Sequence, residues 1–262
     1  MDFTETITGR PGTIRTYKSL YKKHLSQIIW DKWDESNSLR VLVAEWEDKS
    51  LSVATQVSLL RVLKRLGAHN GFELDVRDKI RSLERSKQER EIKVWDNAQA
   101  KKAKDWVKSE MLEFKSEFLL GLHGGLRRGE VYGLQRRDIQ YDRNRIAVRR
   151  SYNGPTKSGK TRFVPLSREL KNALAFAKDF EETQKLFKTR NPNEDMDKVC
   201  KELDLPRITF HGLRHSFATS ALENGVSPRI VANWLGHSSV MTTLAIYWQV
   251  VNEDEVSLNF LP

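Results

Sequence analysis

The segment from Arg85 to Asn97, RSKQEREIKVWDN, is highly charged and nearly devoid of apolar residues. This composition is typical of an exposed linker between two separately packed regions. On both sides of it, apolar residues recur at spacings that can form a core. We therefore predict a helical domain over residues 1–84, a linker over residues 85–97 and a second domain over residues 98–262.

The first domain shows helical spacing of its apolar residues. An amphipathic helix of about five turns is expected to follow Pro11, with apolar side chains at positions 14, 17, 21, 25 and 28. Further helices are expected over residues 39–46, 50–66 and 75–83. Gly67 and Gly71 are predicted to end the third helix, because glycine tolerates the left-handed conformation that often follows a helix.

The second domain combines helical and extended patterns. A long helix with apolar residues at positions 103, 107, 111, 114 and 118 is expected to end near Gly121. The runs IAVRRSY and TRFVPL are β-rich and are separated by turn formers, which predicts a small antiparallel sheet of about three strands. Helical spacing returns over residues 167–180. The fold class expected is mainly α with a small antiparallel β-sheet, in two domains.

Short helices are expected from about residue 197 to the end of the chain. One of them is predicted to begin at Ser227 as N-cap, with Pro228 at the first helical position. The side chains expected to form core in this part are Phe217, Leu222, Ile230 and Leu235.

Basic residues are concentrated in one segment of the second domain. The formal net charge is +10, and twelve Lys or Arg but only three acidic residues lie between Arg127 and Arg168. This density predicts salt-sensitive binding of a phosphate backbone, although a solvated basic hairpin is an alternative. The candidate DNA-binding residues are Arg128, Arg136, Arg137, Arg149, Arg150, Lys160 and Arg162.

Several classes of protein are disfavoured. No apolar run approaches the roughly 18 to 20 residues needed to cross a bilayer, and the N-terminus lacks a basic start and an apolar signal core. We therefore expect no membrane association and a cytoplasmic, nucleoid-associated protein. The single cysteine, Cys200, cannot form an internal disulfide, and no CxxC pair is present to build a zinc site.

The sequence HGLR places two polar side chains three residues apart. On a helix His211 and Arg214 share a face, and a helix N-terminus adds partial positive charge for an anion. Isolated HxxR matches are common, so a surface ion-pairing role is the alternative. His215 is expected to point elsewhere, as a buried and hydrogen-bonded histidine.

Five features occur together in the second half of the chain, in this order: GLHGGLRRGEVYGL at 121–134, TKSGKTRFVPL at 156–166, HGLRHSFAT at 211–219, LGH at 235–237, and Tyr247. This combination resembles the tyrosine recombinase family, the phage integrases and their relatives. The resemblance covers residues 100–250. The first half is similar to the core DNA-binding domain of that family only in size and class.

The resemblance implies roles for individual residues. Arg127 would bind the phosphate and Glu130 would orient it, although a helix-surface ion pair is an alternative for Glu130. Lys157, eight residues before Pro165, falls on the position of the family's hairpin lysine, with Lys160 as the competing candidate. The other family positions fall on His211, Arg214, His237 and the nucleophile, Tyr247.

The chemistry accounts for these residue types. Attack on a DNA phosphodiester concentrates negative charge on the non-bridging oxygens, which two arginine side chains can hold. A tyrosyl ester conserves the bond energy, so the strand can be rejoined without a nucleotide cofactor. His211 is the candidate base and Lys157 the candidate proton donor to the departing 5′ oxygen. With arginines binding the phosphate, we expect neither a metal nor another cofactor.

His237 and Tyr247 are ten residues apart, whereas the family more often has nine. Either the loop before the last helix absorbs the extra residue, or Tyr247 is rotated by about 100° around that helix. No other tyrosine follows Arg214, so Tyr247 remains the candidate nucleophile.

The resemblance implies a site-specific DNA recombinase that acts through a 3′-phosphotyrosyl intermediate as a homotetramer on its recombination sites. Accessory DNA-bending proteins are further candidate partners. A type IB topoisomerase-like enzyme and an inactive DNA-binding regulator of the same fold are the alternatives. Residues 252–262 carry alternating apolar side chains, which are expected to dock on a neighbouring subunit or on their own core.

Overall fold

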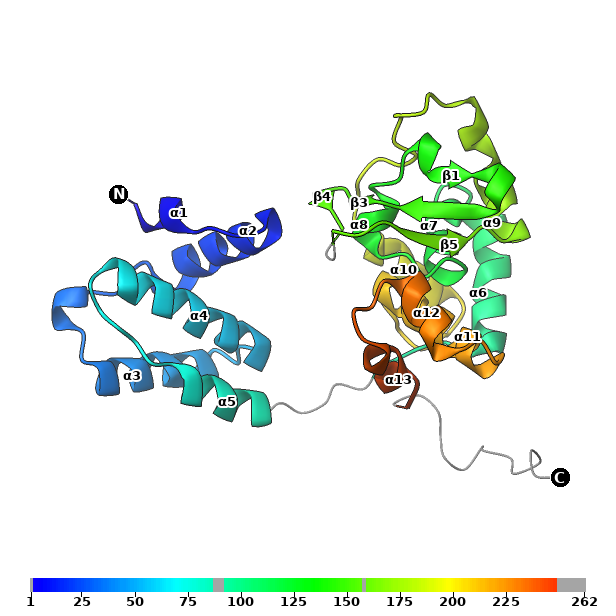
Figure 1. Ribbon diagram of the computed structural model, residues 1–262. Helices are drawn as coiled ribbons and strands as arrows, with labels where there is room; N and C mark the ends of the chain where they lie inside the picture. The colour runs from blue at the N-terminus through cyan, green and yellow to red at the C-terminus, as the bar shows by residue number, and fades with distance from the viewer. Residues whose placement is uncertain (1, 87–91, 157–158, 249–262) are drawn as a thin grey trace. The chain divides into compact units, whose positions relative to one another are not determined.

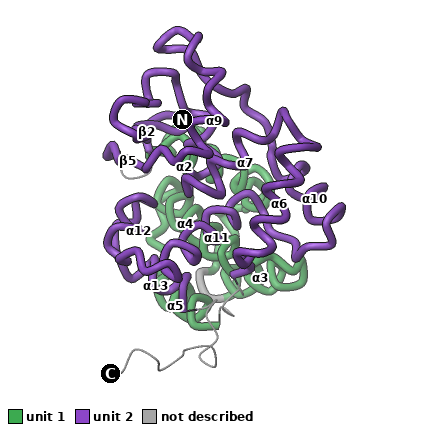
Figure 2. The backbone as a smooth tube through the Cα atoms, turned by 90° about the vertical axis from the view of Figure 1, so that its right-hand side faces the viewer, with its two compact units in different colours: residues 1–90 green, residues 91–262 purple. Residues whose placement is uncertain are grey.

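The computed structural model describes residues 2–86, 92–156 and 159–248. Contacts divide the chain into two compact units, residues 1–90 and residues 91–262 (Figure 2). Helices predominate, with small antiparallel sheets in the second unit, which confirms the predicted fold class (Figure 1). Every helix in these described ranges is too short or too polar to cross a bilayer.

All regular elements described in the first unit are helical. They are α1 (Phe3–Thr6), α2 (Pro11–Leu20), a π-helical turn (Tyr21–Leu25), a 3-10 turn (Trp30–Lys32), α3 (Glu35–Asp48), α4 (Val53–His69) and α5 (Arg77–Arg85). Helix α4 is central, since it packs against both α2 and α5. The buried side chains Trp46, Leu59 and Leu63 belong to one apolar cluster.

Helix α4 extends beyond its predicted end. It continues through Gly67 to His69, so the prediction that Gly67 ends the helix is wrong. A Cβ atom at Gly67 would lie 2.7 Å from Cδ1 of the buried Leu74, so this glycine permits close packing inside the helix. Gly71, which lies after the helix, does adopt the left-handed conformation, with a φ of 84°.

The second unit contains both helices and strands. Its helices are α6 (Asn97–Glu110), α7 (Lys115–Leu122), α8 (Arg128–Val131), α9 (Arg168–Ala173), α10 (Asn193–Glu202), α11 (Phe210–Glu223), α12 (Pro228–Leu235) and α13 (Val240–Trp248). In the described part of this unit, 3-10 turns lie at Arg136–Asp138, Tyr141–Arg143 and Ala175–Asp179. The strands are β1 (Ile139–Gln140), β2 (Arg145–Val148), β3 (Arg150–Ser151), β4 (Gly154–Pro155) and β5 (Arg162–Pro165).

The strands form two antiparallel groups. In the larger sheet the order is β1-β2-β5, with Ile146 of β2 opposite Val164 of β5. Strands β3 and β4 form a separate pair. Strand β5 lies at one edge of the three-stranded sheet and is in contact with α12. This contact brings the hairpin and the C-terminal helices into one region.

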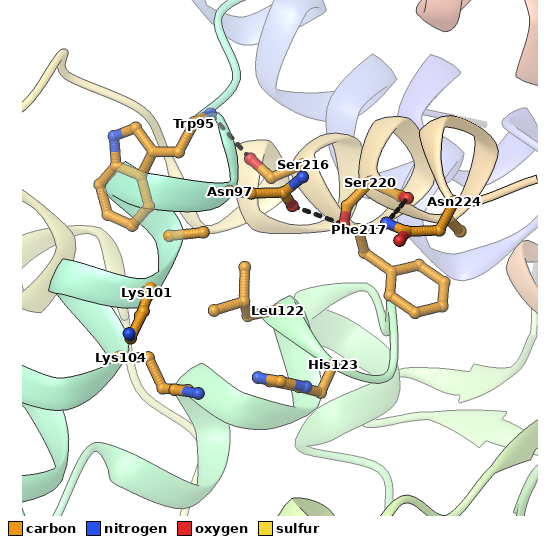
Figure 3. A pocket seen from close by; sticks show the side chains of 12 residues that line it. Trp95, Asn97, Lys101, Lys104, Leu122, His123, Ser216, Phe217, Ser220 and Asn224 are labelled. Carbon is orange, nitrogen blue, oxygen red and sulfur yellow. Dashed lines mark hydrogen bonds between the residues drawn. The ribbon is translucent and has the colours of Figure 1, made fainter.

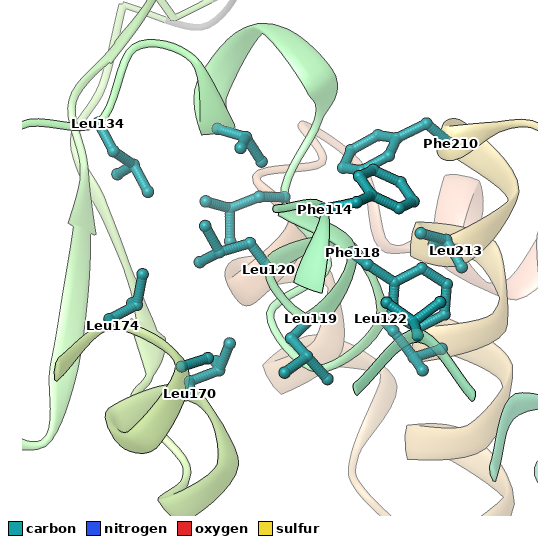
Figure 4. Close-up of a cluster of buried hydrophobic side chains, with 14 of the residues drawn as sticks. Phe114, Phe118, Leu119, Leu120, Leu122, Leu134, Leu170, Leu174, Phe210 and Leu213 are labelled. Carbon is teal, nitrogen blue, oxygen red and sulfur yellow. The ribbon is translucent and has the colours of Figure 1, made fainter. Parts of the chain in front are cut away.

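Helix α7 contributes Phe118, Leu119, Leu120 and Leu122 to the apolar cluster of the second unit (Figure 4). All its side chains from Ser116 to Leu122 are buried, and it packs against α6, α9 and α11. Phe118 and Phe210 lie in the same cluster. A helix that is apolar on nearly every side has to be covered on every side. Helix α11, which carries the HGLR motif, is therefore anchored on α7.

The predicted long helix is in fact two helices. Helix α6 ends at Glu110 and α7 begins at Lys115, with a turn between them. Helix α6 is partly exposed, whereas α7 is buried on all sides, so one straight helix could not satisfy both environments. Packing therefore breaks the helix, although the helical spacing of apolar residues continues through this point. Ile230 is likewise not core, because it is 45% exposed, whereas Leu235 is fully buried.

Trp95 and Asp96, which were expected in the linker, belong to the fold of the second unit. The indole of Trp95 is buried and its Nε1 donates to the Pro206 carbonyl at 2.9 Å. Asp96 caps α6 by accepting from the Gln99 backbone N–H at 2.8 Å. The burial of the indole and these two hydrogen bonds therefore fix the chain just before α6.

We expect Gly67→Ala to destabilise the first unit by about 1–3 kcal/mol, because the added methyl group would overlap the buried Leu74 side chain. Gly12→Ala is the matched control, since nothing lies within 4 Å of its Cβ position and alanine favours helix. Urea unfolding of both variants measures the difference. Equal stability of the two variants would show that Gly67 is not needed for packing.

Candidate active site

Arg127 and Glu130 form a local cap at the start of α8. The backbone N–H of Arg127 donates to Oε2 of Glu130 at 2.8 Å, and its Nη1 donates to Oε1 at 3.0 Å. Glu130 is buried, whereas the Arg127 side chain is 31% exposed. Arg127 therefore reaches solvent while its inner side is held by a buried carboxylate.

Arg162, at the start of β5, binds the same carboxylate. Its Nη1 and Nη2 donate to Oε1 and Oε2 of Glu130 at 2.8 and 2.7 Å, which is bidentate geometry. Its Nε donates to the Trp234 carbonyl at 2.6 Å. The side chain is 11% exposed, so its guanidinium lies inside the protein.

Arg214 is the most deeply buried of the three arginines, with 2% exposure. Its Nη1 donates to the Gly125 carbonyl at 2.7 Å and its Nη2 to the Leu235 carbonyl at 2.6 Å, while Nη1 lies 3.9 Å from Glu130. Leu235 also accepts from Arg127 at 3.3 Å. The Leu235 carbonyl belongs to the end of α12, where backbone oxygens lack partners within the helix and carry partial negative charge, whereas Gly125 lies in the loop before α8.

The three guanidinium groups surround one carboxylate. Burial opposes ionisation of Glu130, but the hydrogen bonds and charges of Arg162 and Arg127 outweigh it and lower the pKa of Glu130. Burial, together with the charge of Arg127, lowers the pKa of Arg214 to about 9, so this side chain stays cationic at neutral pH. The cluster therefore carries excess positive charge, which favours an anionic ligand.

Two histidines of α11 pack against each other. The rings of His211 and His215 meet edge to face, with centroids 4.6 Å apart. The expectation that His215 is hydrogen-bonded is not met, because its Nδ1 is buried without a partner among the described residues. Burial and the charges of Arg214 and Arg127 lower the pKa of His211, so this ring is neutral at pH 7.

His237 lies in the turn after α12. Gly236 adopts a left-handed φ of 67°, and the His237 N–H then donates to the Ala232 carbonyl at 3.0 Å. Nδ1 of His237 is hydrogen-bonded to Oγ1 of the buried Thr243 at 2.8 Å. Burial and the nearby arginines, Arg214 first, lower the pKa of His237 to about 4.

Tyr247 lies on α13, which packs against α11 and α12. It is half-buried and follows Thr243 by four residues, so both side chains lie on the same side of the helix. Ile246, nine residues after His237, is buried. Tyr247 therefore lies on the same side of α13 as Thr243, whose hydroxyl group is hydrogen-bonded to His237.

Residues 96–254 of the chain match the model of the Phage integrase family. The chain belongs to this family. A XerC-like tyrosine recombinase of Caldanaerobacter subterraneus subsp. tengcongensis is 26% identical over 210 residues, which cover 64% of this chain and 53% of that protein. Tyrosine recombinase XerA of Pyrococcus horikoshii is 34% identical over 149 residues, or 52% of this chain and 50% of that protein. The chain thus spans about half the length of these curated relatives.

Solved structures share the integrase fold. A lambda integrase tetramer bound to a Holliday junction is 16% identical, with a TM-score of 0.74, and the match covers 98% of this chain and 78% of that chain. The Tn1549 transposon integrase in complex with circular intermediate DNA is 19% identical, with a TM-score of 0.71 and coverage of 96% and 95%. At these identities the likeness shows the fold.

The integrase motifs converge in the structure. Arg127, Glu130 and Arg214 are in direct contact, and His211 and His237 lie within the electric field of the same arginines. Lys157 lies outside the described residues, as does the tail over residues 252–262. Their predicted roles therefore have no structural counterpart here.

The candidate DNA-binding residues fall into two groups. Arg128, Arg137 and Lys160 are exposed, and Arg149 is 3.4 Å from Asp138 with a largely exposed side chain. In contrast, Arg150 donates to both Gln135 and Asp138 at 2.7 Å, Arg162 is held by Glu130, and Arg136 lies over the Tyr141 ring. The structure does not favour DNA contact by this second group, because buried or aromatic partners occupy their guanidinium groups.

Sequence reasoning overlooked two features of this candidate site. Thr243 gave no signal, because a threonine in an apolar helix is common. The inward orientation of Arg162 had a signal, since it lies two residues before the buried Val164 and so shares a face of β5.

A separate cavity of about 290 Å³ lies between α6 and α11 (Figure 3). It is lined by Phe217 and Ser220 of α11, by Asn224 directly after that helix, and by residues of α6 that include Lys101 and Lys104. The arginine cluster does not take part in it.

We expect Glu130→Gln to lower the free energy of unfolding at pH 7 by roughly 3–5 kcal/mol, because three guanidinium groups would lose their common anion. The lowered pKa of Glu130 stabilises the folded protein above its ordinary value of 4.5, and this contribution is lost as the pH falls through the folded-state pKa. The variant should therefore lose stability less steeply than wild type below pH 4.5. Denaturant unfolding across this pH range checks it, with the exposed Glu110→Gln as control. Parallel curves for wild type and Glu130→Gln would contradict the assignment.

Proposed function

We propose that this chain is a site-specific DNA recombinase that cleaves and rejoins strands through a 3′-phosphotyrosyl intermediate. The observation that carries the proposal is the cluster of Arg127, Arg162 and Arg214 around the single carboxylate of Glu130. Family membership adds the reaction class. The proposed partner is double-stranded DNA that contains specific recombination sites.

The phosphate would bind at the exposed side of the arginine cluster. The Arg127 side chain is partly exposed to solvent, and Arg214 supplies a buried positive charge beside the same carboxylate. Fixed donors of this kind stabilise the charge that develops on the non-bridging oxygens during attack. The neutral His237, with Nδ1 on Thr243, can add the N–H of Nε2 when the hydroxyl group donates to Nδ1.

In the proposed cleavage step, Oη of Tyr247 bonds to phosphorus and the bond from phosphorus to the 5′ oxygen breaks. The tyrosine proton passes to His211, whose lowered pKa keeps it neutral and able to accept a proton at pH 7. The departing 5′ oxygen takes a proton from Lys157, a role that rests on the family resemblance. Attack by an incoming 5′ hydroxyl group reverses these steps and rejoins the strand.

Assembly and the role of the first unit are further parts of the proposal. We assign residues 1–90 as the core DNA-binding unit and a homotetramer on DNA as the active assembly. The support is the fold shared with a lambda integrase tetramer bound to a Holliday junction. Sedimentation of the full chain with and without target duplex would detect a tetramer that forms only on DNA.

Tyr247→Phe should abolish covalent complex formation, because phenylalanine lacks the attacking oxygen. The substrate is a nicked suicide duplex whose site has been selected by binding from a random library, and a denaturing gel reports the adduct. Tyr17→Phe in the first unit is the control and should still form the adduct. An adduct with Tyr247→Phe would disprove the nucleophile assignment, and a wild type that binds without an adduct would indicate a regulator. Relaxation of supercoiled plasmid without the selected site would favour the topoisomerase alternative.

Arg128→Gln should weaken duplex binding for all sequences and reduce the slope of log K against log salt by about 1, as expected for one lost phosphate contact. Arg150→Gln should leave that slope unchanged, because Asp138 and Gln135 hold its guanidinium. Fluorescence anisotropy at several salt concentrations measures both. An equal change in slope for Arg150→Gln would show that this residue contacts DNA.

A further inference from the structure

We propose that Arg162 is a positioning residue for DNA cleavage, which holds Glu130 and the turn that carries His237, and that it does not contact DNA. This inference rests on the recombinase function proposed above. It concerns a residue whose place in a basic hairpin suggested phosphate binding from the sequence alone.

The hydrogen bonds of Arg162 leave little capacity for a phosphate. Three of its five N–H groups have acceptors: both oxygens of Glu130 and the Trp234 carbonyl, at 2.6 to 2.8 Å. The side chain is nearly buried. Withdrawing it toward DNA would leave a buried carboxylate and a helix-end carbonyl without this donor.

The first consequence of these contacts concerns Arg127. Each oxygen of Glu130 accepts from Arg162 and also from Arg127, through Nη1 at Oε1 and the backbone N–H at Oε2. The bidentate pair fixes the rotation of the carboxylate and takes up part of its charge. Without Arg162, Glu130 would turn and pair more closely with Arg127, which would then be less available to the phosphate.

The second consequence concerns His237. Arg162 binds the Trp234 carbonyl, which lies at the end of α12, three residues before His237. A Cβ atom at Gly236 would lie 2.8 Å from Cδ of Arg162, so the glycine of LGH leaves room for this side chain as well as making the left-handed turn. Arg162 therefore joins β5, Glu130 and the His237 turn into one rigid unit.

The test compares binding with cleavage in Arg162→Gln and Arg162→Lys of the full chain on the suicide duplex. We expect duplex affinity and its salt slope to stay within about twofold of wild type, whereas the single-turnover cleavage rate falls on the order of 100-fold, as for a small misplacement of catalytic groups. Lysine should not rescue cleavage, because an ammonium group cannot bind both carboxylate oxygens in fork geometry. Arg190→Gln, which removes an arginine from another buried carboxylate, Glu117, should cleave normally. A loss of affinity that equals the loss of rate would overturn the proposal.

A double-mutant cycle tests whether Arg162 acts through Glu130. If it does, Arg162→Gln/Glu130→Gln should cleave no more slowly than the slower single variant, because the two changes remove one interaction. Arg162→Lys keeps a positive charge beside Glu130, so it remains informative if Arg162→Gln alone fails to fold. Losses that multiply, or a double variant that cleaves at the wild-type rate, would overturn the proposal.

A readout independent of cleavage separates this proposal from the proposed function. We expect Arg162→Lys to change the ring ¹⁵N shifts of His237 in the protein without DNA, and Arg190→Gln to leave them unchanged. Unaltered His237 shifts in Arg162→Lys would overturn the positioning role. If wild type binds duplex but never forms an adduct, the recombinase function fails, whatever the His237 shifts show.

Discussion

Glu130 is the buried charge on which the arrangement of the second unit depends. Three guanidinium groups cannot lie this close together unless an anion offsets their repulsion, and one ionised carboxylate does so while leaving positive charge in excess. Its partners come from the loop before α8, from β5 and from α11. These segments are distant in sequence, so the ion cluster forms only when the whole unit has folded.

Backbone carbonyls complete what a single carboxylate cannot. The backbone oxygens of the last turn of α12 have no partner within the helix. Those of Trp234 and Leu235 accept hydrogen bonds from all three arginines. Gly236 ends the helix at that point by its left-handed conformation. A longer α12 would pair these carbonyls internally and remove the acceptors. The residue at which α12 ends therefore determines which backbone oxygens are available to the arginines.

The sequence predicted the members of the cluster better than their orientation. The motifs indicated Arg127, Glu130 and Arg214, which the structure brings into contact, because their residue types and spacing are tied to phosphate chemistry. The basic segment did not reveal that Arg150 and Arg162 point to buried carboxylates. Net charge reports only that cations are present, whereas their direction depends on strand register and on acids elsewhere in the chain. Gly67 shows the same limit, since its role depends on contact with Leu74 rather than on local conformation.

The ten-residue step from His237 to Tyr247 can be understood from the bond between His237 and Thr243. That bond fixes one side of α13 against the turn. At about 100° per residue, Tyr247 lies roughly 40° around the helix from Thr243 and Ile246 roughly 60° in the other direction. The extra residue therefore keeps the tyrosine on the side that faces His237 and places the apolar Ile246 in the core. A nine-residue step would instead put the tyrosine at position 246, whose side chain is buried in the core. The longer spacing therefore agrees with the way in which Thr243 anchors this helix.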